Sequence, residues 1–222
     1  MKKNVILKLK DVDYRYADAK EDEYVLKDIN YEFQSGKVYA IRGRSGSGKT
    51  TLLSLISGLE NGYEGEITFA GKSLKKIDLD KYRSSDIGII FQSYNLLPHL
   101  TAMENIVLSM DVSGQKIENK NERAVKLMES VGLRAEQKDR RVLKLSGGEQ
   151  QRVAIARSLA YNPKVIIADE PTGNLDKETE SEILEIFREL AKKKNKCVII
   201  VTHSENVCES ADEVYELKKR KK

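Results

Sequence analysis

The chain has 222 residues, enough for one domain with a sizeable core or for a core that carries small subdomains. Its net charge of +4 is small and its basic residues are not interleaved with aromatic ones, so the composition gives no indication of a nucleic-acid partner. No apolar run approaches the length that spans a bilayer, and the alternating residues 5–10 are typical of a strand, not of a signal peptide. We therefore expect a cytoplasmic protein.

The first part of the chain has the pattern of an antiparallel sheet. Apolar side chains alternate with polar ones between residue 4 and about residue 35. Further along, the pattern predicts a strand over Val38–Ile41, a helix over Lys49–Ser57, and short strands over Gly65–Gly71 and Ile87–Phe91.

Helical signals dominate residues 93 to 160, where we expect a helical subdomain within a single domain 1–222. It includes a capping box formed by Thr101 and Glu104, and helices over residues 121–131 and 148–161. Strand and helix then alternate again, with a strand over Val165–Ala168, a helix over Asp176–Lys194 and a strand over Cys197–Val201. This order predicts an α/β fold with a mainly parallel sheet, an N-terminal antiparallel β subdomain and an inserted helical subdomain.

Residues 43–50 read G-R-S-G-S-G-K-T and fit the phosphate-binding pattern G-x-x-x-x-G-K-[ST]. A polyphosphate must be wrapped by backbone N–H groups, and Gly46 and Gly48 allow the backbone conformations that this needs. Lys49 supplies a positive charge, and the Thr50 hydroxyl can bind Mg²⁺. A chance glycine-rich turn is the alternative, but an expected strand before the motif and an expected helix after it favour phosphate binding.

Polar side chains also follow three other expected strands, at Gln92, at Asp169-Glu170 and at His203. Because open parallel sheets bind ligands outside the carboxyl ends of their strands, we expect all of these groups at one site. Asp169 is suited to holding Mg²⁺, and Glu170 to polarising an attacking water. The alternatives are ordinary turn chemistry for Asp-Glu before a proline, and a purely structural role for His203.

A second anion cradle is predicted at residues 145–152, L-S-G-G-E-Q-Q-R, where a serine and two glycines open a helix. One γ-phosphate hardly needs two cradles from the same chain. We therefore expect a head-to-tail homodimer in which each nucleotide lies between the phosphate loop of one chain and the serine-glycine turn of its partner.

Together these motifs resemble the ATPase subunit of ABC transporters, and the resemblance covers nearly the whole chain. It implies a P-loop NTPase fold, with ATP and Mg²⁺ as cofactors. By resemblance, ATP is bound by Tyr16, Gly43, Arg44, Ser45, Gly46, Ser47, Gly48, Lys49, Thr50 and Thr51. The metal is bound by Thr50, Gln92 and Asp169, catalysis falls to Glu170 and His203, and the partner's ATP meets Ser146, Gly147, Gly148, Glu149 and Asp176. Tyr14 competes with Tyr16 for the place of the aromatic ring that stacks on adenine.

Residues 91–105 and 169–176 are similar to a narrower group that serves macrolide export, lipoprotein release and antimicrobial-peptide resistance. This similarity implies a permease partner with a large extracellular domain, and a place on the inner face of the plasma membrane through that permease. Substrate contacts are then expected in the permease. The alternative is a cell-division ATPase that drives a membrane partner regulating cell-wall hydrolases. A soluble ABC protein acting on ribosomes or DNA is disfavoured, since the chain has neither a second nucleotide domain nor a long coiled coil.

Two segments are candidates for membrane-side contacts. Tyr94, Leu96, Leu97 and Leu100 form an apolar group that either docks a cytoplasmic helix of the permease or packs beneath the helix capped at Thr101. The basic residues 218–222 either contact anionic lipid head groups or form a solvated tail.

Overall fold

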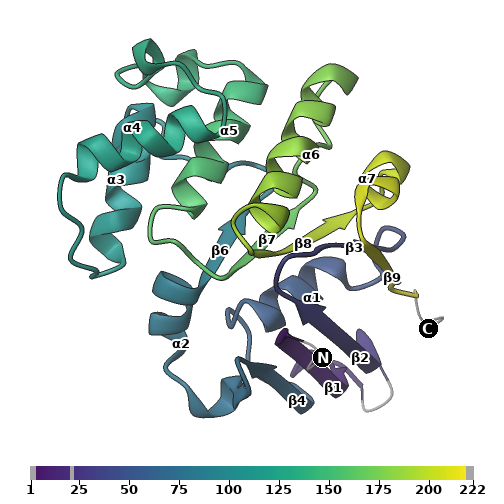
Figure 1. Ribbon diagram of the computed structural model, residues 1–222. Helices are drawn as coiled ribbons and strands as arrows, with labels where there is room; N and C mark the ends of the chain where they lie inside the picture. Colours follow the sequence, from purple (N-terminus) through teal and green to yellow (C-terminus); the bar gives the residue numbers. More distant parts are fainter. Residues whose placement is uncertain (1–3, 21–22, 219–222) are drawn as a thin grey trace.

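The computed structural model describes residues 4–20 and 23–218, which form two sheets with helices around them (Figure 1). The strands are β1 (Val5–Tyr14), β2 (Leu26–Gln34), β3 (Val38–Arg42), β4 (Glu64–Phe69), β5 (Lys72–Ser73), β6 (Ile87–Ile90), β7 (Val165–Asp169), β8 (Cys197–Thr202) and β9 (Glu213–Glu216). The longer helices are α1 (Lys49–Ile56), α3 (Ala102–Val112), α4 (Lys120–Ser130), α5 (Gly147–Ser158), α6 (Lys177–Lys192) and α7 (Glu205–Ser210). Short helical turns are η1 (Leu74–Lys76), α2 (Leu79–Lys81), η2 (Tyr82–Asp86), η3 (Ala135–Gln137) and η4 (Val142–Lys144).

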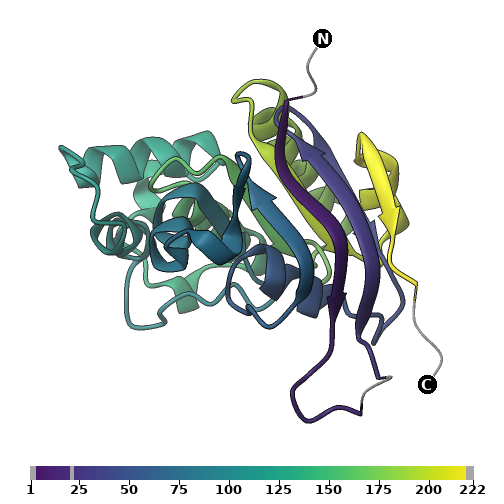
Figure 2. The ribbon, with the colours of Figure 1, turned by 90° about the horizontal axis from the view of Figure 1, so that it is seen from below.

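The first sheet is antiparallel and has the order β2-β1-β4-β5. Leu7 lies opposite Phe33 and Leu9 opposite Tyr31, so the apolar residues of the alternating pattern share one face, which is buried. Figure 2 shows β1 and β2 side by side along one flank of the molecule, away from the helices α3 and α4.

The second sheet is parallel and has the order β6-β7-β8-β3-β9. Its strands are apolar on both faces because each face covers a different core. Ile167 and Ile199 point into a core shared with α1 and the antiparallel sheet. Ile166 and Ile200 point into a core shared with α3, α5 and α6. This double burial explains the unbroken apolar runs that the sequence shows at β7 and β8.

The helical region predicted between residues 93 and 160 is formed by α3, α4 and α5, which lie together at one end of the molecule (Figure 1). Thr101 and Glu104 make the predicted capping box at the start of α3. The predicted helix 148–161 ends early, at Ser158, and a turn follows in which Asn162 adopts φ 57° before Pro163. Leu159 and Ala160 remain buried after the helix has ended, which is why the apolar pattern suggested a longer helix.

Three features were not expected from the sequence: residues 72–86 with their short turns, α7, and the edge strand β9. The basic run 218–222 lies outside the described residues apart from Lys218. Within residues 4–20 and 23–218, no helix is both long and apolar enough to cross a bilayer.

Candidate active site

The carboxyl ends of the parallel strands meet at one edge of the sheet. Arg42 at the end of β3 lies beside Thr202 at the end of β8, and Val201 lies beside Asp169 at the end of β7. β6 pairs with β7 in register, so Gln92 follows at the same edge. The structure thus brings the loops after the four strands together, as expected from the sequence.

The loop after β3 is shaped by glycines. Gly48 has φ 92° and forms the N-cap of α1, and a Cβ at this position would lie 2.9 Å from Leu26 Cδ2. A Cβ on Gly43 would lie 2.4 Å from Ser47 Oγ and 2.9 Å from the Leu217 carbonyl oxygen. The loop can therefore close tightly only with glycine at these two positions.

Lys49 turns back over this loop. Its Nζ donates to the carbonyl oxygens of Gly43 at 2.8 Å and Arg44 at 3.4 Å. The ammonium group therefore lies within the turn formed by residues 43–49, next to the first backbone N–H groups of α1, where the helix dipole also favours an anion. A phosphate group in this turn would meet the charge and the N–H donors together.

Asp169 and Thr50 form the part of the site suited to a divalent cation. Thr50 Oγ1 lies 3.5 Å from Asp169 Oδ2. Burial raises the pKa of the Asp169 carboxyl and the Glu170 carboxylate raises it further, while Lys49 and the Thr50 hydroxyl lower it. A half-buried carboxylate held at a raised pKa is stabilised by a cation. One carboxylate and one hydroxyl suit Mg²⁺, which takes its other ligands from phosphate and water, and the Gln92 amide at the same edge of the sheet is the third candidate donor.

Glu170 and His203 lie in contact across the ends of β7 and β8. His203 Nδ1 is 2.7 Å from Glu170 Oε1, and Glu170 Oε2 accepts from Thr202 Oγ1 at 3.2 Å and from the His203 backbone N–H at 3.3 Å. Glu170 itself has φ 45°, and its N–H donates to Val201 O at 2.9 Å. The Glu170 side chain is 11% exposed and that of His203 is 71% exposed, so the carboxylate is fixed while the imidazole ring faces solvent.

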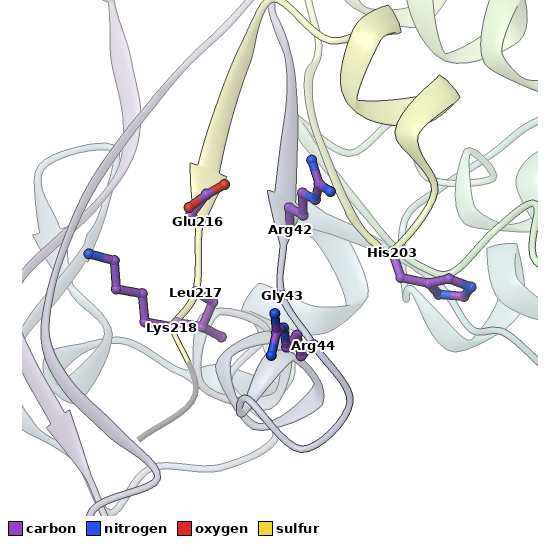
Figure 3. A pocket seen from close by; sticks show the side chains of 7 residues that line it. All are labelled: Arg42, Gly43, Arg44, His203, Glu216, Leu217 and Lys218. Carbon is purple, nitrogen blue, oxygen red and sulfur yellow. The ribbon is translucent and has the colours of Figure 1, made fainter. Parts of the chain in front are cut away.

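A groove of about 630 Å³ lies beside the phosphate loop. In Figure 3, Arg42, Gly43 and Arg44 lie at the end of β3, with Glu216, Leu217 and Lys218 on one side and His203 on the other. Arg42 pairs with Glu205 at 3.1 Å. Arg44 and Lys218 are the other basic residues of the lining and Glu216 is its acidic one, and through Gly43 and His203 the groove adjoins the candidate site.

Ser146, Gly147, Gly148 and Glu149 start helix α5. The Ser146 hydroxyl accepts from the Glu149 N–H at 3.2 Å, and the Glu149 carboxylate accepts from the Ser146 N–H at 2.7 Å. Asp176 caps α6 in a similar way, accepting from the N–H groups of Glu178 and Thr179. Among the described residues, no hydrogen bond or ion pair joins these groups to residues 43–51, so within one chain the two anion cradles are not connected.

Of the two candidate tyrosines, Tyr16 is the accessible one. Tyr14 is 4% exposed, whereas Tyr16 is 49% exposed, and their rings meet edge to face at 5.3 Å. The Tyr16 hydroxyl lies 3.1 Å from Thr51 Oγ1, next to the phosphate loop. This placement favours Tyr16 as the ring that meets a nucleotide base.

Two residues of this region were missed from the sequence. Thr202 donates a hydrogen bond to Glu170, and its position at the end of an apolar strand is the only indication of this role in the sequence. Glu180 contacts the loops after both β7 and β8, and nothing in its local sequence indicates this.

Residues 26–173 match the family described as ABC transporter. The chain is 44% identical over 211 residues to the macrolide export ATP-binding/permease protein MacB of Rhodopirellula baltica, covering 93% of this chain and 30% of that protein. It is 40% identical over 215 residues to the lipoprotein-releasing system ATP-binding protein LolD of Rickettsia bellii, covering 97% of this chain and 96% of that protein. The solved dimeric ABC transporter cassette MJ0796 has a TM-score of 0.87 and 37% identity, covering 96% of this chain and 95% of that chain. The same cassette is also solved in a post-hydrolysis state with ADP and Pi.

These findings confirm the family, the α/β fold and the ATPase activity predicted from the sequence. The chain belongs to the ABC transporter family, as one of its ATP-binding, ATP-hydrolysing subunits.

Proposed function

We propose that this subunit powers a separate membrane permease that performs export, or resistance to macrolides or antimicrobial peptides, and that Glu170 and His203 carry out the hydrolytic step. The observation that carries the proposal is the cluster of Glu170, Thr202 and His203 beside the phosphate loop. The names of the MacB and LolD relatives support an exporting or releasing transporter. The subunit would then lie at the inner face of the plasma membrane, held there by the permease.

In this mechanism, Glu170 accepts a proton from the water that attacks the γ-phosphate. Its Oε1 atom now faces the His203 ring, so the ring must turn away before Oε1 can meet water. Once this contact is broken, the exposed ring of His203 can turn toward the γ-phosphate, where it would stabilise charge in the transition state. Mg²⁺ held by Thr50, Asp169 and Gln92 would neutralise phosphate charge when bound.

The substitution Glu170→Gln tests this role, because an amide cannot accept the proton. Turnover should fall by about a hundredfold or more, with ATP affinity retained. Glu209→Gln, an exposed glutamate of α7, is the matched control and should hydrolyse ATP normally. Normal turnover in Glu170→Gln would remove Glu170 from the mechanism.

We also propose that the complete site forms in a homodimer, with Ser146, Gly147, Gly148, Glu149 and Asp176 facing the partner's ATP. Two separate anion cradles in one chain, and the dimeric state of the MJ0796 cassette, support this arrangement. Because the Glu170→Gln variant retains bound ATP, it should elute as a dimer with Mg-ATP in gel filtration and as a monomer without nucleotide. A variant that is monomeric under both conditions, with its permease present, would contradict the dimer.

The contact with the permease is proposed at a groove of about 480 Å³ whose lining includes Leu97, Leu108, Val112, Arg157 and Tyr161. Leu97, Leu108 and Val112 are exposed apolar residues, with Val112 the most exposed at 71%. Tyr94 and Leu96 instead pack against the core that includes α3 and α5, so only part of the expected apolar segment is available for docking. The Arg157 side chain donates to the carbonyl oxygens of Tyr94, at 2.7 Å, and of Asn95, and so fixes the segment just after Gln92.

An amphipathic cytoplasmic helix of the permease suits this groove, since it can place apolar residues on Val112 and Leu97 and polar ones toward its rim. The double variant Leu97→Ser and Val112→Ser should lose co-purification with the permease while its melting temperature stays near that of the wild type. Val214→Ser, at an exposed apolar residue of the edge strand β9 that does not line the groove, is the control. Co-expression with an extracellular-domain permease and, separately, with a cell-division membrane protein decides between the exporter and the cell-division alternative. The true partner should stimulate ATP hydrolysis.

A further inference from the structure

Glu180 lies on the first turn of α6 and joins two loops that carry the hydrolytic groups. Its Oε1 atom accepts from Thr172 Oγ1 at 3.1 Å and from Ser204 Oγ at 3.1 Å. Its Oε2 atom accepts from Asn206 Nδ2 at 3.2 Å. Thr172 is in the loop that follows Glu170, and Ser204 and Asn206 follow His203, so one carboxylate spans both loops.

The contact with Ser204 differs from the usual behaviour of a serine before a helix. Ser204 is the N-cap residue of α7, yet its side chain makes no capping bond to its own helix. Its hydroxyl donates to Glu180 instead, while its backbone N–H donates to Thr202 Oγ1 at 3.0 Å. The side chain and N–H of Ser204 are therefore held by α6 and β8, while its carbonyl oxygen accepts from the Cys208 N–H of α7 at 3.3 Å.

His203 lies between two residues that are fixed in this way. Thr202 is tied to Glu170, and Ser204 is tied to Glu180. The backbone on both sides of the exposed imidazole is thus held in register with the loop that carries Glu170. Movement of His203 between Glu170 and a phosphate is then restricted to rotation of its side chain, which limits the positions that the ring can reach.

We propose that Glu180 is a positioning residue for ATP hydrolysis, which holds the loop of His203 in register with the loop between Glu170 and Asp176. The inference rests on the proposed role of His203 in the hydrolytic step. It assigns no contact between Glu180 and the nucleotide. Loss of Glu180 should therefore lower the turnover number and leave ATP binding intact.

The same surroundings allow a graded set of variants. Glu180→Ala removes all three hydrogen bonds. In Glu180→Gln the retained oxygen can still accept from Thr172 and Ser204, and the Asn206 amide can turn to accept from the new NH₂ group. Ser204→Ala breaks the tie from the other side without altering α6. Glu178→Ala is the matched control, because Glu178 is an exposed carboxylate on the same first turn.

Values of kcat and KM come from phosphate release by the full chain, with its permease present where the permease is needed. ATP affinity comes from equilibrium dialysis. We expect Glu180→Ala to lower kcat about tenfold, with KM and ATP affinity within about twofold of the wild type. Ser204→Ala should lower kcat several-fold, and Glu180→Gln and Glu178→Ala should stay within about twofold of the wild type. The double variant Glu180→Ala with His203→Ala should be no slower than His203→Ala alone, because both changes disable the same group.

Wild-type turnover in both Glu180→Ala and Ser204→Ala, beside a slow His203→Ala, would overturn the role of Glu180 and leave that of His203 standing. If the fold-decrease in kcat of the double variant equals the product of the decreases in Glu180→Ala and His203→Ala, the role of Glu180 is also overturned, because Glu180 would then act independently of His203. Wild-type turnover in His203→Ala would refute the proposed hydrolytic role of His203 and this inference with it. If Glu180→Ala does not fold, Ser204→Ala decides the outcome by the same criteria.

Discussion

Replacement of Gly148 by alanine should destabilise the contact between the starts of α5 and α6. A Cβ at this position would lie 2.7 Å from Thr179 Cγ2, but 3.8 Å from Thr179 Oγ1 and 3.9 Å from Thr179 Cβ. Carbon atoms pack best at about 3.5–4.0 Å, so only the threonine methyl group is in the way. The threonine cannot simply rotate, because its hydroxyl donates to Asp176 Oδ2 at 2.8 Å.

The size of the effect follows from these contacts. Overpacking of this kind costs about 1–3 kcal/mol, and rotation of Thr179 would lose a hydrogen bond worth about 1 kcal/mol. Alanine gains at most about 1 kcal/mol over glycine from helix propensity. We therefore expect Gly148→Ala to lower the free energy of unfolding by about 1–2 kcal/mol.

Thr179→Ser offers a rescue, since serine lacks the methyl group and keeps the hydroxyl that binds Asp176. Alone it should cost less than about 0.8 kcal/mol, the value of one buried methylene. With the obstructing methyl removed, the double variant should regain nearly wild-type stability, which gives a coupling free energy of about 1–2 kcal/mol in the stabilising direction.

Urea denaturation of the nucleotide-free chain measures this coupling without involving ATP. Gly147→Ala is the matched control, because a Cβ there would lie 3.4 Å from the Tyr94 hydroxyl and 3.9 Å from Leu175, and would not touch Thr179. It should show no coupling to Thr179→Ser. If the free energies of unfolding lost in Gly148→Ala and in Thr179→Ser simply add in the double variant, the steric explanation is refuted.

Three further predictions concern the nucleotide site. Lys49→Ala should weaken ATP binding by about 10- to 100-fold in equilibrium dialysis, because a charge on the phosphates is lost, whereas Lys72→Ala on the exposed β5 should bind normally. Tyr16→Ala should weaken ATP binding by about tenfold and Tyr16→Phe by less than about twofold, if the ring stacks on the base; equal losses would assign the effect to the hydroxyl near Thr51. Because the pKa of Asp169 is raised in the folded chain, the folded state binds the carboxyl proton more tightly than the unfolded state does. The stability that protonated Asp169 contributes is therefore fully present below the ordinary pKa of 3.8 and is lost as the pH rises through the folded pKa. Asp169→Asn should therefore become more stable relative to the nucleotide-free wild type between pH 4 and pH 7, and a difference that does not vary with pH in urea denaturation would contradict this.

The elements that were predicted correctly are those whose sequence pattern reflects burial. β7 and β8 are unbroken apolar runs because both of their faces are covered, and α1 is preceded by a glycine-rich turn that few other structures require. β9 was missed because it is a four-residue edge strand with glutamates at both ends, held by its pairing with β3. α7 was missed because six residues carry too little periodicity to distinguish a helix from a turn.

The same limit applies to the candidate site. Asp169, Glu170 and His203 could be predicted to lie close together, because Asp169 ends an apolar strand, Glu170 and His203 each follow one, and parallel strands end at one edge of the sheet. Glu180 lies within an ordinary amphipathic helix, and its partners Thr172, Ser204 and Asn206 are separated from it by 8, 24 and 26 positions. Only the packing of α6 against the parallel sheet brings these groups together, so no local pattern could have revealed them.

Ser146, at the start of α5, can cap its own helix and still bind the phosphate group proposed above. In its capping bond Ser146 uses the hydroxyl oxygen as an acceptor, toward the Glu149 N–H, and this leaves the hydroxyl proton free to donate. A phosphate oxygen is an acceptor and can receive that proton without breaking the cap. The Glu149 carboxylate, in contrast, already accepts from the Ser146 N–H and from the Gln137 amide. An approaching triphosphate would therefore find donors at Ser146 and at the first backbone N–H groups of α5, with the negative charge of Glu149 already hydrogen-bonded within its own chain. Helix capping and anion binding are compatible here because they use opposite sides of the same hydroxyl group.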